Sequence, residues 1–326
     1  MNPKKLHCAT VVFIIYFFSL NVHSQLEIGF YSILCSEVEF IVKDEVRKAF
    51  AMNPRIAAGL VRMHFHDCFI RGCDASVLID STPQNTAEKD SPANSPSLIG
   101  YEVIDNAKAR LEAVCEGIVS CADIVAFAAR DSFEMTGGLG YDVPAGRRDG
   151  RISLASETIK LPSPAFNVDQ LTKIFAAKGL TQEEMVTLTG AHTIGHSHCS
   201  SFSNRLYNFS GTSRQDPSLD RSYAIRLKRQ CPQGSTNQSL VVPMNPSSPG
   251  RADVGFYVDV LVNRGLFTSD QVLLKNPATK KQVRENARKP SLWMRKFSAA
   301  MVKMGQIGVI TGDDGEIRRN CRVVNG

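Results

Sequence analysis

The 326-residue chain contains no apolar run of eighteen residues, and its most apolar stretch, from Val11 to Leu20, is too short to cross a bilayer. It also lacks a basic cluster, because its net charge of +6 is scattered along the sequence. These absences predict a protein that neither spans a membrane nor binds nucleic acid. The mild positive charge fits ordinary solubility, or a weak attraction to an acidic polysaccharide.

The N-terminus has the pattern of a secretory signal peptide. Residues 1–24 begin with two lysines, pass through the apolar stretch and end in small polar residues. We therefore predict that the mature protein starts at Gln25 and is exported. Two glycosylation sequons, at Asn208 and Asn237, agree with that route.

Nine cysteines are present, and one of them, Cys8, lies within the predicted signal peptide. The remaining eight form an even set. In an exported chain such a set predicts four disulfides, without deciding which cysteines pair.

Apolar residues recur at helical spacing through most of the chain, and few credible strands are found. Thr181 and Glu184 form a capping box that begins one helix, which ends near Leu188. Residues 82–100 and 208–252 are rich in polar and turn-forming residues and are predicted as loops. Other helices are predicted over residues 36–52, 101–114, 120–135, 167–178, 253–263, 269–274, 279–287 and 291–304. The pattern indicates a mainly all-α protein.

The segment from Arg62 to Ser76 concentrates reactive side chains in a short stretch. If it is helical as far as His66, then Arg62 and His66 stand one turn apart, with Phe65 beside them. A guanidinium, an imidazole and an aromatic ring then share one surface, which is typical of a reaction site.

The residues that follow this helix suit a hard cation. Asp67, Asp74 and Ser76 alternate with the flexible Gly72, and carboxylate, hydroxyl and carbonyl oxygens are the ligands that calcium prefers. We predict a calcium site that holds the reaction helix in place.

His192 is the centre of a second candidate site. It follows a predicted helix, and an imidazole far from His66 in the sequence could flank a flat cofactor from the opposite side. His192, His196, His198 and Cys199 also have the spacing of a zinc or copper cluster, although Cys199 is needed to keep the cysteine number even. A metal-dependent hydrolase therefore stays open at this point, as does a secreted binding module without catalysis.

Two further features have plain structural interpretations. Arg147 and Asp123 are predicted to form an ion pair inside the fold. Trp293, the only tryptophan, shares a predicted helix with Phe297 and Met301 and is expected in the core.

Taken together, these segments resemble the plant secretory (class III) haem peroxidases. The similarity runs from about Gln25 to the C-terminus, and the combination of motifs is highly specific although each one alone is not. It rests on residues 61–69, 72–76, 146–149, 190–195 and 269–271.

The resemblance implies that His66 is the acid and base on the distal side of a haem, with Arg62 as its electrostatic partner and Phe65 over the haem edge. It makes His192 the axial iron ligand on the proximal side. The chemistry agrees, because peroxide must lose a proton to bind iron and regain one on its outer oxygen. A single imidazole suits both steps.

The same resemblance assigns supporting residues. Asn94 is expected to accept a hydrogen bond from the distal histidine, with Glu88 as its support, and Asp270 to accept from the axial histidine. Pro162 matches a position near the exposed haem edge, where aromatic donors dock.

The resemblance also implies two calcium sites and the pairing of the cysteines. The distal calcium ligands are expected to be Asp67, Ile70, Gly72, Asp74 and Ser76, together with Glu88. The proximal ligands are expected to be Thr193, Asn245, Ser248, Arg251 and Asp253. The expected disulfides are Cys35–Cys115, Cys68–Cys73, Cys121–Cys321 and Cys199–Cys231. Because Asn245 stands where the family usually has an aspartate, we expect calcium to bind the proximal site weakly or not at all.

The implied fold is mainly all-α and two-lobed, with a distal lobe over residues 25–165, a proximal lobe over residues 166–326 and the haem between them. The absence of a Cys-x-x-Cys-His sequence indicates non-covalent haem b. The implied activity is the reduction of hydrogen peroxide and the one-electron oxidation of small phenolic donors through high-valent iron. We expect a monomer in the extracellular space or cell wall, where acidic polysaccharide is a candidate partner.

Overall fold

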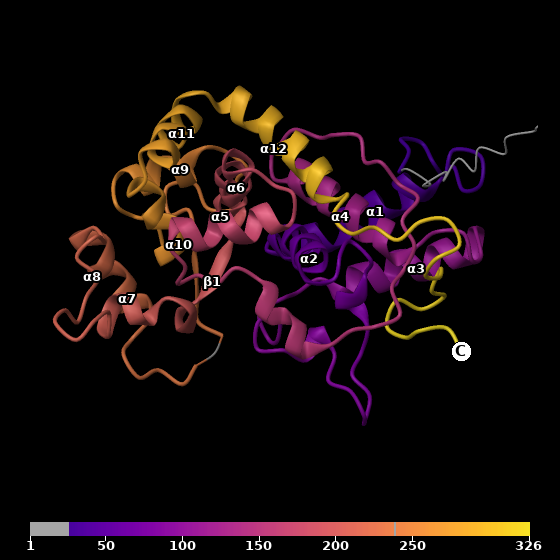
Figure 1. Ribbon diagram of the computed structural model, residues 1–326, viewed down its shortest axis with the longest axis horizontal. Helices are drawn as coiled ribbons and strands as arrows, with labels where there is room; N and C mark the ends of the chain where they lie inside the picture. The colour runs from indigo at the N-terminus through magenta and orange to yellow at the C-terminus, as the bar shows by residue number, and fades with distance from the viewer. Residues whose placement is uncertain (1–25, 238) are drawn as a thin grey trace, which may run out of the picture.

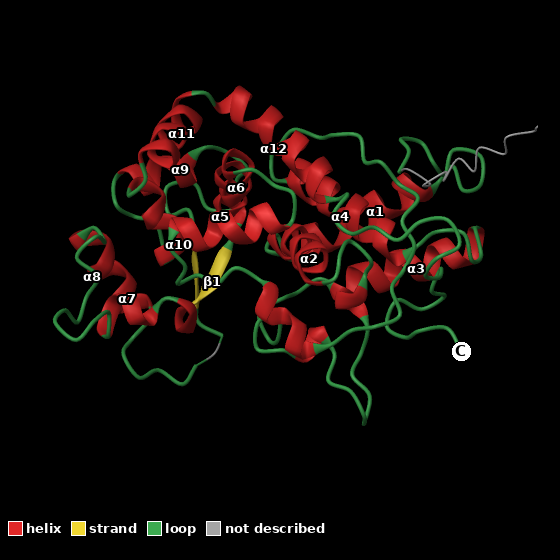
Figure 2. Cartoon of the chain, in the orientation of Figure 1, coloured by secondary structure: helices red, strands yellow, loops and turns green. Residues whose placement is uncertain are grey.

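The structure, a computed structural model, describes residues 26–237 and 239–326, so the expected signal peptide and its cleavage point lie outside the described residues. Figure 2 shows a mainly helical chain. In the described residues, β1 (His196–His198) and β2 (Val241–Pro243) form one antiparallel pair of strands. The prediction of a mainly all-α protein with few strands is confirmed. Within the described ranges, no helix is both long and apolar enough to cross a membrane.

Most helices begin and end within a few residues of the predicted bounds. The α-helices are α1 (Val38–Met52), α2 (Ile56–Ile70), α3 (Tyr101–Val114), α4 (Cys121–Met135), α5 (Val168–Ala177), α6 (Gln182–Thr189), α7 (Ser203–Tyr207), α8 (Arg221–Gln230), α9 (Gly255–Leu261), α10 (Thr268–Gln271), α11 (Pro277–Arg288) and α12 (Pro290–Met304). Short 3-10 helices are η1 (Ser76–Leu78), η2 (Glu88–Asp90), η3 (Ala155–Lys160), η4 (Gly190–Ile194), η5 (Cys199–Ser201) and η6 (Val272–Leu274).

Helix α2 packs against α4 near the middle of the molecule (Figure 1). One side of α2, with Leu60 and Met63, joins a hydrophobic core shared with α1, α3 and α4. Another side, with Val61 and Phe69, joins a second core shared with α5, α6, α9, α11 and α12. Trp293 is fully buried in this second core, as predicted. Because α2 lies between two cores, it is apolar around most of its circumference.

The N-terminus of α6 has the predicted capping box. The Glu184 backbone N–H donates to Thr181 Oγ1 at 3.1 Å, and the Thr181 backbone N–H donates to Glu184 Oε2 at 2.7 Å. Both donors are ones that a helix start leaves without an intrahelical partner. The cap therefore fixes where α6 begins, and α6 leads directly into η4.

The region predicted as loop over residues 208–252 contains α8, which the sequence interpretation missed. The helix buries only Tyr223, Ala224 and Leu227, and most of its other residues are charged or polar. Its start is capped by Asp220, whose Oδ1 accepts from the Tyr223 backbone N–H at 2.8 Å. The sequence pattern that could have predicted α8 is an aspartate at the N-cap, Asp220, followed by apolar residues at helical spacing, Tyr223, Ala224 and Leu227.

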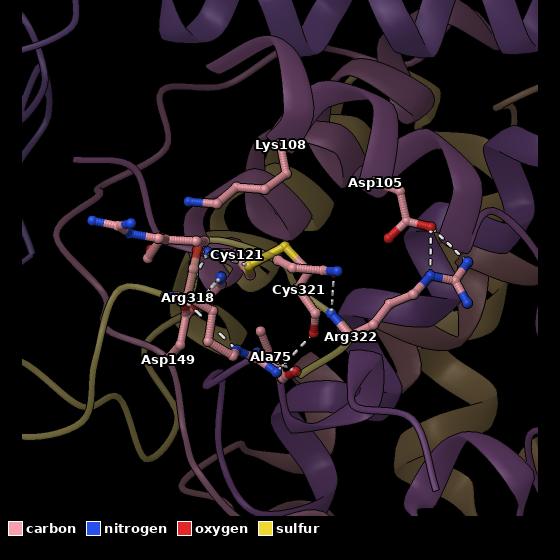
Figure 3. Close-up of a disulfide and its surroundings, with 12 residues drawn as sticks. Ala75, Asp105, Lys108, Cys121, Asp149, Arg318, Cys321 and Arg322 are labelled. Carbon is pink, nitrogen blue, oxygen red and sulfur yellow. Dashed lines mark hydrogen bonds and ion pairs between the residues drawn. A yellow bond between two sulfur atoms is a disulfide. The ribbon is translucent and has the colours of Figure 1, made fainter. Parts of the chain in front are cut away.

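The segment after α12 returns to the N-terminal half of the chain, where the yellow C-terminus lies beside α3 in Figure 1. The disulfide between Cys121 and Cys321 joins it to the start of α4. Figure 3 shows the buried Arg318 in the same place, with Nη2 donating to the carbonyl oxygen of Ala75 at 2.6 Å. The C-terminus thereby braces the loop that follows α2.

The predicted ion pair between Arg147 and Asp123 is present and buried. Arg147 Nη1 lies 2.6 Å from Asp123 Oδ1, and Arg147 Nη2 donates to the carbonyl oxygen of Gly305 at 2.7 Å. The other carboxylate oxygen of Asp123 accepts from the Tyr31 hydroxyl at 2.8 Å. Because both charges are paired and hydrogen-bonded, their burial is tolerated, and the pair links α4 to the end of α12.

Candidate active site

His66, near the C-terminal end of α2, has its imidazole fixed through Nδ1. Nδ1 lies 2.5 Å from Asn94 Oδ1, and Asn94 Nδ2 donates to the carbonyl oxygen of Glu88 at 2.7 Å. Since the amide nitrogen is committed to that carbonyl, the amide oxygen accepts from His66. Nδ1 of His66 therefore carries the proton and Nε2 carries the lone pair. The three residues expected to act together are in contact.

Arg62 stands one turn before His66 on the same helix. Its Nε donates to His66 Nε2 at 3.1 Å, its Nη1 donates to Ser97 Oγ at 3.0 Å, and its Nη2 donates to the carbonyl oxygen of Ala93 at 2.8 Å. The sequence interpretation did not identify Ser97 or Ala93, because the composition of their segment indicated only a loop. These contacts hold the guanidinium beside the imidazole.

Burial sets the charge state of both groups. It lowers the pKa of His66 well below the usual value, and the neighbouring charge of Arg62 lowers that pKa further. Burial also lowers the pKa of Arg62, to about 10. At neutral pH the imidazole is therefore neutral and the guanidinium charged, which is the state required for a base beside an electrostatic partner.

Only one side of α2 has side chains that are accessible to solvent. Ala58, Arg62 and Phe65 are its only residues that are not buried, and their spacing places them on one side of the helix. The His66 ring meets the Phe65 ring edge to face, with centroids 5.7 Å apart. Arg62 and Phe65 thus lie on the single accessible surface of α2, and the buried imidazole of His66 lies beside them.

His192 lies in η4, directly after α6, and its imidazole is also held through Nδ1. Nδ1 is 2.8 Å from Asp270 Oδ1, and Asp270 Oδ2 accepts from the Phe267 backbone N–H at 2.8 Å. The aspartate is fully buried, whereas the imidazole is 31% exposed. A carboxylate only accepts hydrogen bonds, so Nδ1 of His192 carries the proton and Nε2 is suited to bind a metal.

The two histidine networks adjoin the same hydrophobic core. Phe65 on α2 and Ala191 in η4 both pack against it, and α2 and η4 are in contact. The chain therefore brings His66 and His192 into one region of the molecule, as the sequence interpretation required.

The distal loop, residues 71–75 between α2 and η1, lies beside Asp67 of α2 and Glu88 of η2, so that three elements bring carboxyl groups together. Asp67, Asp74 and Glu88 are all buried, and within the described residues neither carboxyl oxygen of Glu88 nor the hydroxyl of Ser76 has a hydrogen-bond partner. Burial raises the pKa of Glu88 to about 8, and burial followed by repulsion from Asp74 raises the pKa of Asp67. Burial also raises the pKa of Asp74. A cation at this place would relieve the mutual repulsion.

The other residues of this loop fix its shape. Gly72 has φ of 137°, and a Cβ there would collide with the carbonyl oxygen of Gly308, so only glycine allows this close approach. The short disulfide between Cys68 and Cys73 spans the same turn. The carbonyl oxygen of Ile70 lies 3.4 Å from Lys178 Nζ. The proposed distal ligands thus lie on a tightly constrained loop.

A second group of oxygen-bearing residues surrounds Thr193. Thr193 Oγ1 donates to the carbonyl oxygen of Arg251 at 3.0 Å and lies 2.8 Å from Asn245 Nδ2. Asn245 Nδ2 is also 2.9 Å from Ser248 Oγ, which donates to Asp253 Oδ1 at 2.9 Å. The five residues expected around a second calcium are therefore brought together, with an amide nitrogen among the oxygens.

The cysteines pair as the resemblance implied. The disulfides are Cys35–Cys115, Cys68–Cys73, Cys121–Cys321 and Cys199–Cys231.

The zinc or copper cluster considered from the sequence is not supported. Cys199 is consumed by its disulfide, and a disulfide sulfur is not a thiolate ligand. Within the described ranges, His64, Cys68 and Cys73 also lie close together, but these two cysteines are bonded to each other and offer no thiolate.

Pro162 is half-buried on the loop between η3 and α5. The same loop is tied to α10, because the Ser269 backbone N–H donates to the carbonyl oxygen of Pro164 at 2.9 Å. This contact lies next to Asp270. It does not test the role of Pro162 in donor docking, which stays a prediction.

Comparisons with known proteins agree with the motifs. A family model described as Peroxidase matches residues 42–289. Peroxidase 5 of Vitis vinifera is 70% identical over 328 residues, which cover 100% of both chains. Peroxidase 1 of Zea mays is 48% identical over 310 residues, covering 94% of this chain and 84% of the relative. Peroxidase 3 of Arabidopsis thaliana is 48% identical over 307 residues, covering 93% of each.

These matches extend over nearly the whole described chain and include every segment on which the resemblance rests. The family works with a haem-type cofactor and calcium, and it uses hydrogen peroxide to oxidise organic donors. The chain belongs to the plant class III peroxidase family and is a peroxidase.

Proposed function

We propose that this peroxidase is a secreted haem enzyme that reduces hydrogen peroxide with the help of His66 and oxidises small phenolic donors in one-electron steps. The observation that carries the proposal is the pair of imidazoles whose Nδ1 atoms are held by Asn94 and Asp270. In both, Nε2 carries the lone pair, and in His66 that lone pair faces Arg62 Nε at 3.1 Å. Only His66 has a guanidinium beside it, so the two imidazoles suit different tasks.

The residues present fit a haem. The accessible stripe of α2 offers Arg62 and Phe65, and η4 offers the partly exposed imidazole of His192. A histidine that binds a metal normally donates its other N–H to a carboxylate or carbonyl, and Asp270 meets that requirement. Haem b held without a covalent bond would supply the redox chemistry that the side chains lack.

His66 is proposed to move the proton of the reaction. Its Nε2 accepts the proton that peroxide loses and later returns it to the outer oxygen, which is the one that leaves as water. The bond from Nδ1 to Asn94 keeps the required tautomer, and the lowered pKa keeps the ring neutral beforehand. Arg62 stabilises the negative charge that develops as the O–O bond breaks.

Replacing Asp270 with asparagine is expected to raise the Fe(III)/Fe(II) reduction potential of the haem-loaded protein. An amide oxygen is a weaker acceptor than a carboxylate, so His192 becomes a poorer electron donor to iron and stabilises the ferric state less. A spectroelectrochemical titration measures the potential.

Asp259→Asn is the matched control for this experiment. Asp259 is also a buried carboxylate, but its Oδ1 accepts from Ser247 Oγ at 2.7 Å. Its replacement is expected to leave the potential at the wild-type value. Equal potentials in Asp270→Asn and the wild type would remove Asp270 from this role.

The loop after α2 fits a calcium ion, and we propose that it holds the distal one. The partnerless oxygens of Glu88 and Ser76 are hard ligands, and the buried Asp67 and Asp74 supply negative charge. The carbonyl groups of residues 70 and 72 are the remaining proposed ligands. Asp67 directly follows His66, and the Glu88 carbonyl holds Asn94, so the ion would stabilise both partners of the distal hydrogen bond.

Removing calcium with a chelator is expected to lower the rate of the peroxide reaction by about 10- to 100-fold, before any haem is lost. Without the ion, the carboxyl groups around Asp67 repel one another and the imidazole of His66 loses its placement. Stopped-flow rates and haem absorbance followed on the same samples separate the two events. Full activity in calcium-free protein, or haem loss that precedes the fall in rate, would contradict this coupling.

We also propose that the enzyme acts outside the cell. Export is supported by the signal-peptide pattern of residues 1–24 and by the exposure of Asn208 and Asn237, the asparagines of the two sequons. We propose a monomer with a distal lobe over residues 25–165 and a proximal lobe over residues 166–326. Its site of action would be the extracellular space or cell wall, where acidic polysaccharide would be a weak partner. Phenolic donors would dock near Pro162.

A further inference from the structure

Asn245 follows β2 and is fully buried, with its side-chain nitrogen surrounded by oxygen atoms. Nδ2 lies 2.8 Å from Thr193 Oγ1 and 2.9 Å from Ser248 Oγ. The Ser248 carbonyl oxygen is 3.1 Å away, and Asp253 Oδ1 is 3.4 Å away. The two N–H groups of one amide therefore point into the set of oxygens expected to hold a second calcium.

The orientation of this amide is fixed from its other side. Asn245 Oδ1 accepts from the Ser248 backbone N–H at 3.2 Å. Turning the amide over, so that its oxygen could bind a cation, would direct Nδ2 at that backbone N–H and leave two donors facing each other. It would also break the bonds from Nδ2 to Thr193 and Ser248. Calcium binding at this place therefore costs several hydrogen bonds.

The surrounding oxygens already have protein partners. Asp253 Oδ1 accepts from the Gly255 backbone N–H at 2.8 Å and from Ser248 Oγ at 2.9 Å, and it lies 3.1 Å from Thr193 Oγ1, whose single proton is directed at the carbonyl oxygen of Arg251. The place around the distal loop differs, because the oxygens of Glu88 in η2 and the hydroxyl of Ser76 in η1 have no such partner within the described residues. Asp253 Oδ1, Thr193 Oγ1 and Ser248 Oγ therefore have hydrogen-bond partners without a cation, whereas the carboxyl oxygens of Glu88 have none within the described residues.

The number of carboxylates also argues against a calcium ion near Thr193. The group around Thr193 contains a single carboxylate, that of Asp253, whereas Asp67, Asp74 and Glu88 are buried together around the distal loop. Calcium sites gain affinity with the number of negatively charged oxygen ligands. One carboxylate shared with several donors is a poor match for a divalent ion, so the residues around Thr193 do not fit calcium.

We propose that the Asn245 amide takes the place of the second calcium ion, so that the chain binds one calcium ion and holds the segment after His192 by hydrogen bonds. Thr193 follows His192 directly, and the amide bonds Thr193 to Ser248 and Asp253. The placement of the axial histidine is then independent of calcium, while that of His66 depends on it. The inference rests on the proposed function only in its choice of the two calcium positions.

Calcium counting tests the inference. Protein stripped of metal and titrated with calcium chloride in a calorimeter is expected to bind one ion in the wild type and two in Asn245→Asp. The aspartate has nearly the same shape, replaces the amide donor by an acceptor and adds one negative charge. Two tightly bound ions in the wild type, or a single ion in Asn245→Asp, would overturn the proposal.

Asp74→Asn identifies which ion is counted. This variant removes a charge from the distal loop and is expected to lose the single ion of the wild type. Retention of one tightly bound ion would place that ion near Thr193 and overturn the proposal. If Asn245→Asp does not fold, the wild-type and Asp74→Asn counts still decide. Calcium stoichiometry is measured without haem or peroxide turnover, so the result is separate from the fate of the proposed enzymatic function.

Discussion

Replacing His66 with alanine is expected to slow the reaction of the haem-loaded protein with hydrogen peroxide by about 10²- to 10⁴-fold, the range that general acid–base catalysis contributes. The variant loses the lone pair on Nε2 that accepts the peroxide proton, and it leaves Asn94 Oδ1 without its donor. Haem should stay bound, because the contact between His192 and Asp270 lies on another part of the chain. Stopped-flow absorbance in the Soret region measures the rate.

His64→Ala is the matched control, because it removes the same side chain from the same helix two residues away. His64 is buried, with Nδ1 3.7 Å from Cys68 Sγ, and it takes no part in the hydrogen bonds of Arg62 or His66. This variant is expected to lose stability but to keep the wild-type peroxide rate while folded. A wild-type rate in His66→Ala would remove His66 from its role.

Local patterns predicted the helices where burial is one-sided or the ends are capped. Helix α3 has the predicted bounds, and the capping box of Thr181 and Glu184 marks the start of α6. Helix α8 was missed because it buries only three residues and carries many charges, so its apolar stripe is narrow. Its stability comes from packing against its neighbours, which is visible only in three dimensions.

The reactive helix shows both what spacing can reveal and what it cannot. The interval of four residues between Arg62 and His66 correctly predicted that the two side chains meet. The bonds from Arg62 to Ser97 and to the carbonyl oxygen of Ala93 depend on the path of a loop more than thirty residues away. No periodicity encodes such a path, so these partners could not be predicted.

Charges in the sequence suggested the calcium difference, but only the structure gives its physical cause. Asn245 in place of an aspartate indicates a missing negative charge. The orientation of its amide, fixed by the Ser248 backbone N–H, shows in addition that a hydrogen-bond donor lies among the oxygens.

The even number of cysteines predicted four disulfides, whereas their pairing came from the family resemblance and not from spacing.

Replacing His192 with alanine is expected to abolish stable haem binding while leaving the distal network intact. The variant removes an imidazole whose Nδ1 is held by a buried carboxylate, and with it the proposed bond to iron. Asp270 is then left without its histidine partner. Gel filtration with detection of haem absorbance measures retention, and circular dichroism checks that the variant is folded. An unaltered haem spectrum in His192→Ala would assign the axial ligand to another residue.

The central claim is that the two histidine networks enclose a haem that reacts with peroxide. The most direct test is the absorption spectrum of the wild-type protein, folded with its disulfides formed in the presence of haem, before and after hydrogen peroxide is added. We expect a Soret band that corresponds to one haem per chain and changes when one equivalent of peroxide is added. A correctly disulfide-bonded protein that takes up no haem would contradict it.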